Sequence, residues 1–335
     1  MAQVLSSSDV VRLIQKVGID SFFTQVVDAL QANFHRWQKG RHQPRNSVGY
    51  PQGVMELMPY ADDELYSFKY VNGHPENPRN GKLTVTALGV LFTVHDGYPL
   101  LLSEMTLLTA IRTAATSALA SQILAPKGVN CMAMIGCGAQ SEFQILAQKV
   151  TLGIDTIRYF DPDAQAMEKL KHNLIGAGIK LIPCTSAEEA IEGVALITTA
   201  TAAQKRAHIL PNEKIGKGVH INAIGGDCPG KTELESGLLN RAKIFVEYNP
   251  QTFIEGEIQS LPKTEYTELW QLVQGIKEGR TGDELTIFDS VGYALEDFSI
   301  LKLVHELIKK HPEGKEMLFY PDTKDPKDLY SFLLR

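Results

Sequence analysis

The chain has 335 residues, of which 44% are hydrophobic, and this length and composition predict two globular domains with a core in each. A formal net charge of -6 excludes the broad basic surface that proteins binding nucleic acid or an anionic membrane usually carry. The four cysteines are scattered without a C-x-x-C pair, which excludes a disulfide framework and the usual structural zinc sites.

The amino terminus does not show the charged and then apolar pattern of a secretory signal, and no apolar run reaches the roughly 18 residues of a membrane helix. We therefore expect a cytoplasmic protein with no membrane partner and no nucleic-acid partner. None of the nine histidines lies in a metal-ligand spacing or beside a serine or cysteine motif. No metal site is predicted.

Helical periodicity and strand composition alternate in the first part of the chain. Helices are predicted over residues 8–16, 20–36 and 104–124. A Ser-Ser-Asp cluster suited to an N-cap opens the first of these helices. Between the second and the third, residues 82–94 are rich in Thr, Val and Leu, and Asp96-Gly97 then leads into residues 98–102. This pattern predicts a β-hairpin.

From residue 131 onward, short apolar segments alternate with helical ones. The predicted strands cover residues 131–135, 156–160, 180–183, 194–199, 218–224, 243–247 and 285–288. Alternation of this kind predicts a parallel sheet with helices on both faces, and residues 292–310 are predicted to form a helix that returns to the first domain. We expect an α/β protein with a Rossmann-type, doubly wound parallel sheet in residues 116–307. Residues 1–115 and 308–335 are expected to form an α+β domain for substrate binding and dimerisation.

A glycine loop, Gly136-Cys137-Gly138-Ala139-Gln140-Ser141, follows the first strand of this series and opens a predicted helix. In that context the loop can hold a pyrophosphate on the N–H groups of the helix, and Ser141 is small enough to replace the usual third glycine. Asp161 ends the next predicted strand, about 20 residues further on, where it would bind ribose hydroxyls and repel a 2′-phosphate. The loop therefore predicts NAD rather than NADP; a tight turn without a ligand is the alternative.

A second loop, Asn222-Ala223-Ile224-Gly225-Gly226-Asp227-Cys228-Pro229-Gly230-Lys231, begins at the end of another predicted strand. Its glycines allow a ligand to approach the backbone closely, and a carboxylate there can hold or move a proton. The loop also falls at the carboxyl edge where open α/β sheets bind their ligands. Asp227 is therefore the candidate catalytic group, with a carboxylate that only organises a turn as the alternative.

This second loop resembles the ornithine cyclodeaminase/mu-crystallin family, and its Asp-Cys-Pro-Gly-Lys form resembles the ornithine cyclodeaminase members. The resemblance runs from Arg45 to the Pro-Lys-Asp-Leu segment near the carboxyl terminus and includes the Gly-x-Gly-Ala-Gln loop. It implies conversion of L-ornithine to L-proline and ammonia, with tightly held NAD that is reduced and reoxidised within one cycle. It also implies a homodimer assembled through the amino-terminal domain.

The resemblance implies that Arg45, Lys69 and Arg112 bind the carboxylate of the amino-acid substrate, as such cations can. Arg112 is the most informative, because a charge in an Ala/Leu/Ile helix is costly to bury without a partner; a snorkelling side chain is the alternative. Solvated surface side chains are the alternative for the other two. Glu56 alternates with apolar neighbours, so it is expected to point inward and pair with a substrate ammonium, or else to guard an edge strand.

Further contacts rest on the resemblance alone. It adds Val291 to the substrate site, and it implies that NAD is contacted by Thr84, Arg112, Thr201, Asn222 through Gly225, Lys231 and Ser290. Other members of the fold leave alternatives open: an NAD-dependent amino-acid dehydrogenase, a lysine cyclodeaminase, a ketimine reductase, or a small-ligand binder without catalysis. Ornithine and lysine differ by one methylene, which is worth only about 1–3 kcal/mol in a pocket.

Overall fold

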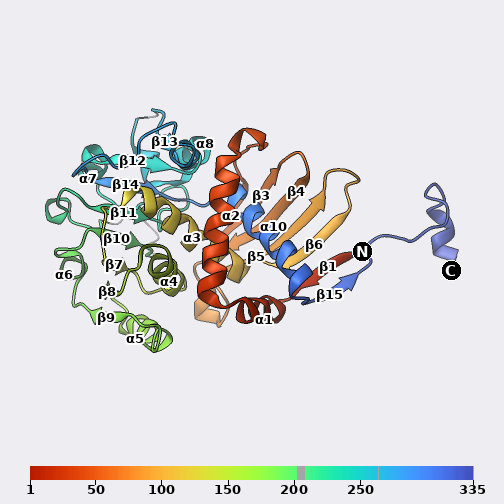
Figure 1. Cartoon of the computed structure of the whole chain (residues 1–335), viewed down its shortest axis with the longest axis horizontal. Helices are drawn as coiled ribbons and strands as arrows, with labels where there is room; N and C mark the ends of the chain where they lie inside the picture. Colours follow the sequence, from red (N-terminus) through yellow and green to blue (C-terminus); the bar gives the residue numbers. More distant parts are fainter. Residues whose placement is uncertain (202–207, 263, 335) are drawn as a thin grey trace.

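The computed structural model describes residues 1–201, 208–262 and 264–334, and they form two β-sheets that lie side by side (Figure 1). The first sheet has seven strands in the order β15-β1-β6-β5-β4-β3-β2. Its strands are β1 (Ala2–Leu5), β2 (Asn46–Tyr50), β3 (Gly53–Ala61), β4 (Leu65–Gly73), β5 (Val85–Thr93), β6 (Pro99–Glu104) and β15 (Lys315–Met317). Strands β2 to β6 are consecutive antiparallel neighbours, and β5 with β6 is the predicted hairpin.

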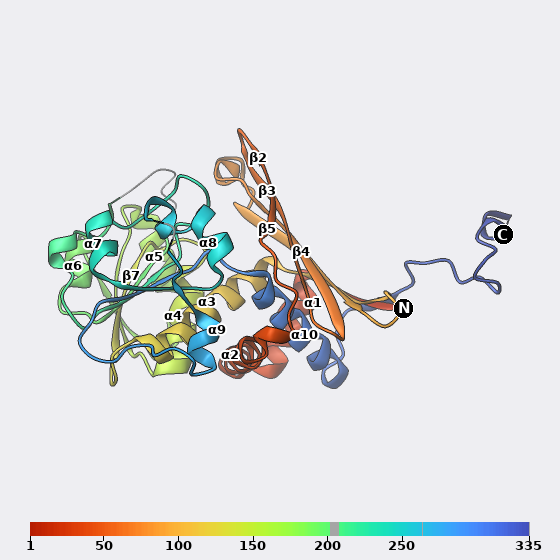
Figure 2. The ribbon, with the colours of Figure 1, turned by 90° about the horizontal axis from the view of Figure 1, so that it is seen from above.

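Helices cover one face of this sheet and leave the other bare (Figure 2). They are α1 (Ser7–Val17), α2 (Ile19–His35) and α10 (Ala294–Lys310), with α3 (Thr106–Leu124) running toward the second sheet. The capping box predicted at the first helix is present, because Ser6 and Asp9 exchange hydrogen bonds. Strand residues on the covered face, such as Met58 and Leu91, are fully buried against the helices.

The second sheet is parallel throughout, with eight strands in the order β13-β12-β14-β11-β10-β7-β8-β9. Its strands are β7 (Cys131–Ile135), β8 (Thr156–Phe160), β9 (Lys180–Pro183), β10 (Leu196–Thr199), β11 (His220–Ala223), β12 (Lys243–Val246), β13 (Thr267–Glu268) and β14 (Thr286–Asp289). Its helices are α4 (Ser141–Leu152), α5 (Ala164–Asn173), α6 (Ala187–Ile191), α7 (Ser236–Arg241), α8 (Asn249–Glu255) and α9 (Leu269–Val273). The predicted doubly wound, Rossmann-type sheet is confirmed.

Alternate residues of one strand show that both faces of this parallel sheet are covered. Met132 and Met134 of β7 join one apolar cluster, whereas Ala133 and Ile135 join another. A strand buried on both faces needs apolar residues at every position, and this is why it appears in the sequence as an uninterrupted apolar run. The strand order reverses between β7 and β10, and such reversals create the crevice in which open α/β sheets bind ligands.

The division of the chain at residues 115 and 307 stays a prediction. Helix α10 packs against α2 and against strands β3, β4 and β5 of the first sheet. We therefore propose that the whole of α10 belongs with the seven-stranded sheet. Within the described residues, no helix combines the length and apolar character that crossing a membrane requires.

Candidate active site

The glycine loop joins the end of β7 to the start of α4 at the reversal of strand order. Gly136 has a φ of 98°, and a Cβ at this position would lie 2.5 Å from the carbonyl oxygen of Ala200, just after β10. Only glycine fits there. Ser141 is fully buried and its Oγ donates to the carbonyl oxygen of Gly138 at 2.7 Å, so the serine closes the turn where a third glycine is usual.

Asp161 is held directly beside this loop. Its Oδ2 accepts a hydrogen bond from the backbone N–H of Cys137 at 2.7 Å, and its Oδ1 accepts one from the N–H of Asp163 at 2.8 Å. The acid and the glycine loop, 24 residues apart in the chain, therefore form one unit at the ends of neighbouring strands. This is the arrangement expected of a dinucleotide site, and the contact of Asp161 with a ribose stays a prediction.

A buried acid, Glu233, lies next to the residues that follow β10 and β11. The backbone N–H of Thr201 donates to Glu233 Oε1 at 2.6 Å, and its hydroxyl donates to the same oxygen at 2.5 Å. A Cβ at Gly225 would lie 2.0 Å from Glu233 Oε1, so this glycine allows the acid to approach. Ala223 and Ile224 are buried between these points. The structure thus brings four residues of the predicted cofactor set to one sheet edge.

Two side chains of the predicted cofactor set make hydrogen bonds to other side chains of the protein. The amide of Asn222 donates to Ser121 Oγ at 2.9 Å, and the hydroxyl of Ser290 donates to Glu247 Oε1 at 2.5 Å. Both therefore fix the positions of strand ends. Thr84 is exposed in the segment before β5, where its carbonyl oxygen accepts from the N–H of His74. Their contacts with a cofactor stay predictions.

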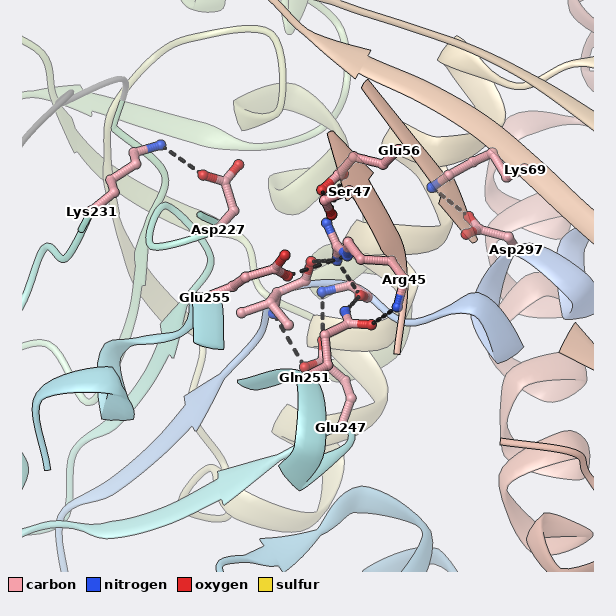
Figure 3. A network of polar contacts seen from close by, with 12 residues as sticks. Arg45, Ser47, Glu56, Lys69, Asp227, Lys231, Glu247, Gln251, Glu255 and Asp297 are labelled. Atoms are coloured by element: carbon pink, nitrogen blue, oxygen red, sulfur yellow. Dashed lines mark hydrogen bonds and ion pairs between the residues drawn. The ribbon is translucent and has the colours of Figure 1, made fainter. Parts of the chain in front are cut away.

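Asp227 lies on the loop after β11 and faces Lys231 (Figure 3). The Lys231 Nζ is 3.0 Å from Asp227 Oδ1, and the Asp227 side chain is 54% exposed whereas the Lys231 side chain is only 15% exposed. Burial opposes the charge of Lys231, but the Asp227 carboxylate raises the pKa of this lysine above its ordinary value. Asp227 thus presents an accessible carboxylate beside a lysine that keeps its charge.

Arg45 is the centre of a buried network that joins the two sheets (Figure 3). Its Nη1 is 2.9 Å from Glu56 Oε2, and its Nε is 3.2 Å from Glu255 Oε2 at the end of α8. Its Nη2 donates to the carbonyl oxygens of Val291 and Gly292 at 2.5 and 2.6 Å. The Arg45 side chain is 7% exposed, so the surface alternative is wrong for this residue. Glu56 points inward, as predicted.

Lys69 on β4 and Arg112 on α3 are both buried, and both side chains lie beside the start of α10. The Lys69 Nζ lies 2.9 Å from Asp297 Oδ1, the Arg112 Nε lies 3.0 Å from the same oxygen, and Arg112 Nη1 pairs with Glu296. Arg112 has no partner on its own helix, and the structure supplies two from a distant segment. The first turn of a helix favours carboxylates, so α10 stabilises both acids. The surface and snorkelling alternatives are wrong for these two cations.

The three cations lie close enough to influence each other. Burial lowers the pKa of Lys69 to about 8, and the charges of Arg112 and Arg45 add to that lowering. Burial also raises the pKa of Glu296 to about 8, although Arg112 opposes this effect. Lys69 and Arg112 are the positive groups that a ligand carboxylate could contact here, and each is paired with an acid of α10 in this structure.

Sequence reasoning missed Asp297 and Glu296. It also missed two further acids of this site. Glu247 follows β12 and is fully buried; it accepts from the Ser290 hydroxyl and, at 3.2 Å each, from the N–H groups of Val291 and Gly292. Its place at a strand end was a usable signal. Glu255 had none, because an acid near the end of a helix is usually solvated. Together these acids position the segment after β14 and the guanidinium of Arg45.

The candidate site is identified by its ionisable side chains and not by a surface depression. A surface depression lined by Gly18, Asp20 and Lys149, among others, holds none of these side chains. Within the described ranges, no group of three or more His, Cys, Asp or Glu residues is placed to hold a metal ion. The candidate site therefore consists of these ionisable side chains and the glycine loop.

Comparison with known proteins gives consistent matches along the chain. The model of the ornithine cyclodeaminase/mu-crystallin family matches residues 7–311. An ornithine cyclodeaminase of Agrobacterium tumefaciens is 52% identical over 333 residues, which cover 99% of this chain and 94% of that protein. A solved lysine cyclodeaminase has 29% identity and a TM-score of 0.92 over 99% of both chains. An archaeal alanine dehydrogenase dimer with bound NAD has 30% identity and a TM-score of 0.87 over 95% of this chain and 99% of that one.

Proposed function

This chain belongs to the ornithine cyclodeaminase/mu-crystallin family, and we propose that it converts L-ornithine to L-proline and ammonia with NAD as its cofactor. The observation that carries the proposal is the division of the site into two halves. Lys69 and Arg112 suit a carboxylate, whereas the acidic group around Glu56 and Asp227 suits an ammonium. An amino acid with a second amine presents both charges. The 52% identity to an ornithine cyclodeaminase supports the same reaction.

The residues of the glycine loop fit a dinucleotide. Gly136 approaches Ala200 closely, and Asp161 accepts a hydrogen bond from the Cys137 N–H. The glycine loop and this acid therefore lie together at the start of α4. Backbone N–H groups of the loop would hold the pyrophosphate, and Asp161 would hold the ribose. When bound, NAD would supply the hydride acceptor for C2 of the substrate and the hydride donor for the same carbon of the cyclic imine.

The side chains of the protein hold the substrate and move its protons. Arg45, Lys69 and Arg112 fix the α-carboxylate, so that C2 faces the sheet edge. The α-ammonium first gives a proton to Asp227, and loss of hydride from C2 then gives an iminium, which the side-chain amine attacks to close the ring. Asp227 then supplies the proton with which the α-nitrogen leaves as ammonia, and Lys231 keeps this carboxylate in place.

A dehydrogenase is the second candidate, because the solved alanine dehydrogenase has the same fold with bound NAD. A lysine cyclodeaminase or a ketimine reductase of the family would use similar groups, and a binder without catalysis would use the same pocket chemistry. The test is to incubate the purified protein with ornithine, lysine or alanine and to measure ammonia, cyclic amino acid and NADH together. We expect ornithine to give equal amounts of proline and ammonia without net NADH. Net NADH without proline would replace this proposal with the dehydrogenase.

Arg112→Lys should raise KM for ornithine strongly. A lysine keeps the charge but cannot reproduce the two-pronged contact of a guanidinium with a carboxylate. Steady-state kinetics will check this, with NAD affinity as the control for a general disturbance of the fold. An unchanged KM and kcat would remove Arg112 from the substrate site.

Asp161→Ala should weaken NAD binding and reduce discrimination against NADP. The change removes the acceptor for the ribose hydroxyls together with the charge that repels a 2′-phosphate. Titration of both nucleotides by protein fluorescence or calorimetry measures the two affinities. If the unmodified protein binds NADP as tightly as NAD, the assignment of Asp161 is wrong.

We further propose a cytoplasmic homodimer formed through the bare face of the seven-stranded sheet (Figure 2). Exposed apolar side chains gather on that face: Val48, Met55, Leu57, Tyr66 and Leu88. A contiguous apolar face of this kind marks an interaction surface, and a two-fold dimer would cover it with its own copy. Leu57→Glu should therefore reduce the mass measured by light scattering toward that of a monomer. A wild-type protein that is monomeric at micromolar concentration would contradict the proposal.

A further inference from the structure

Glu255 is a buried acid that no part of the proposed mechanism has yet used. It ends α8, its side chain is 6% exposed, and its Oε2 lies 3.2 Å from Arg45 Nε. That oxygen is buried and makes no hydrogen bond to any residue that the structure describes. In Figure 3 the carboxylate lies between Asp227 and the guanidinium of Arg45. Glu255 therefore lies on the side of the Arg45 network that is toward Asp227.

The acidic half of the site has more carboxylates than cations. Glu56, Glu255 and Asp227 face Arg45 and Lys231, which leaves one negative charge unmatched when all five are ionised. Burial raises the pKa of Glu255 to about 7, and although Arg45 opposes this effect, the carboxylates of Glu56 and Asp227 reinforce it. The group can therefore accept one more cation, and Glu255 can exchange a proton near neutral pH.

The reaction requires a group of this kind. An alkyl ammonium such as the side-chain nitrogen of ornithine has a pKa near 10, so at neutral pH it carries three protons and no lone pair. It must lose one proton before it can attack C2. A second proton has to reach the departing α-nitrogen. Two acid–base groups with different surroundings allow these transfers to be divided, and Asp227 is exposed whereas Glu255 is buried.

We propose that Glu255 receives the side-chain ammonium of the substrate and removes the proton that this nitrogen must lose before ring closure. The step is balanced: an ammonium and a carboxylate give a neutral amine and a carboxylic acid, and the freed electron pair forms the bond between nitrogen and C2. Asp227 then supplies the proton with which the α-nitrogen leaves as ammonia. The inference rests on the proposed function, because only a diamino acid presents the second nitrogen.

Two reactions of the same protein separate this role from a structural one. The first is conversion of ornithine to proline, and the second is reduction of the cyclic imine, 1-pyrroline-2-carboxylate, by NADH. Both substrates carry the carboxylate, but the imine has already closed its ring. We expect Glu255→Gln to lower kcat for ornithine by about 10²–10⁴-fold, as loss of a proton-transfer group does. It should slow imine reduction by a much smaller factor, because in that reaction only the contact of Glu255 with Arg45 is lost. Glu255→Asp, which keeps the carboxylate, should recover part of the ornithine reaction.

The outcomes are distinguishable. If Glu255 only holds Arg45 in place, Glu255→Gln will slow both reactions by the same factor, and the inference is overturned. Wild-type rates for Glu255→Gln in both reactions would overturn it as well. A wild-type protein that reduces the imine but forms no proline from ornithine would overturn the proposed function itself, and the inference with it. Binding of NADH by each variant verifies that the fold is retained.

Discussion

Asp227→Asn will lower kcat for ornithine by at least about 10²–10⁴-fold, the contribution typical of a general acid–base group. The amide keeps the shape of the side chain but neither accepts nor returns a proton at the substrate nitrogens. NAD binding should be retained, because the change leaves the glycine loop after β7 and Asp161 beside it as they are. Steady-state kinetics and a nucleotide titration on the same preparation measure both effects.

The chain offers a matched control for this substitution. Asp283 is 77% exposed and pairs with Lys217 at 3.4 Å. Asp283→Asn therefore makes the same chemical change at an exposed ion pair that is not part of the site, where such a pair contributes little to stability. Equal losses of activity in the two variants would show that the effect of Asp227→Asn is not proton transfer.

Gly136→Ala will abolish measurable NAD binding and will also destabilise the protein. The φ of 98° is unfavourable for alanine, and its Cβ would lie 2.5 Å from the Ala200 carbonyl oxygen, so β7 and β10 would have to move apart. Backbone strain of this kind costs about 1–3 kcal/mol, and thermal unfolding will detect it. Because the loop shifts with the strands, the N–H groups of α4 would no longer meet a pyrophosphate.

Gly138→Ala separates the two effects. A Cβ at Gly138 meets no atom within 4 Å, and this glycine does not have a positive φ. The variant should therefore unfold at the wild-type temperature, although a methyl group on the loop can still obstruct a bound dinucleotide. If both variants unfold alike, the contact of Gly136 with Ala200 does not determine the shape of the loop.

The parallel sheet was the part of the fold most accessible from sequence. Strands at 131–135, 156–160 and 180–183 were predicted with the bounds they have in β7, β8 and β9. β7 is buried on both faces and therefore has an apolar run, whereas β9 is the edge strand and only its two middle residues are partly buried. In the first sheet, β2 is exposed along its whole length and β4 carries Lys69, so no apolar pattern marks them. Edge position and buried polar groups removed the signal there.

For the site, sequence indicated which groups carry the chemistry but not how they are paired. The cations were found, yet Lys69 meets an acid 228 residues away and Arg112 meets one 184 residues away, separations that no local pattern reveals. The same limit explains why Glu255 was missed. A charged residue that looks solvated in sequence can be buried wherever the fold supplies a partner.

The fate of the C2 hydrogen tests the central claim most directly. Ornithine labelled with deuterium at C2 is converted in the presence of unlabelled NADH, and the proline formed is analysed by mass spectrometry. If the hydride is stored on NAD that stays bound and is then returned to C2, proline will retain the label, and the NADH in solution will stay unlabelled. Label that appears in the NADH pool, or proline that has lost it, would contradict a closed redox cycle at this site.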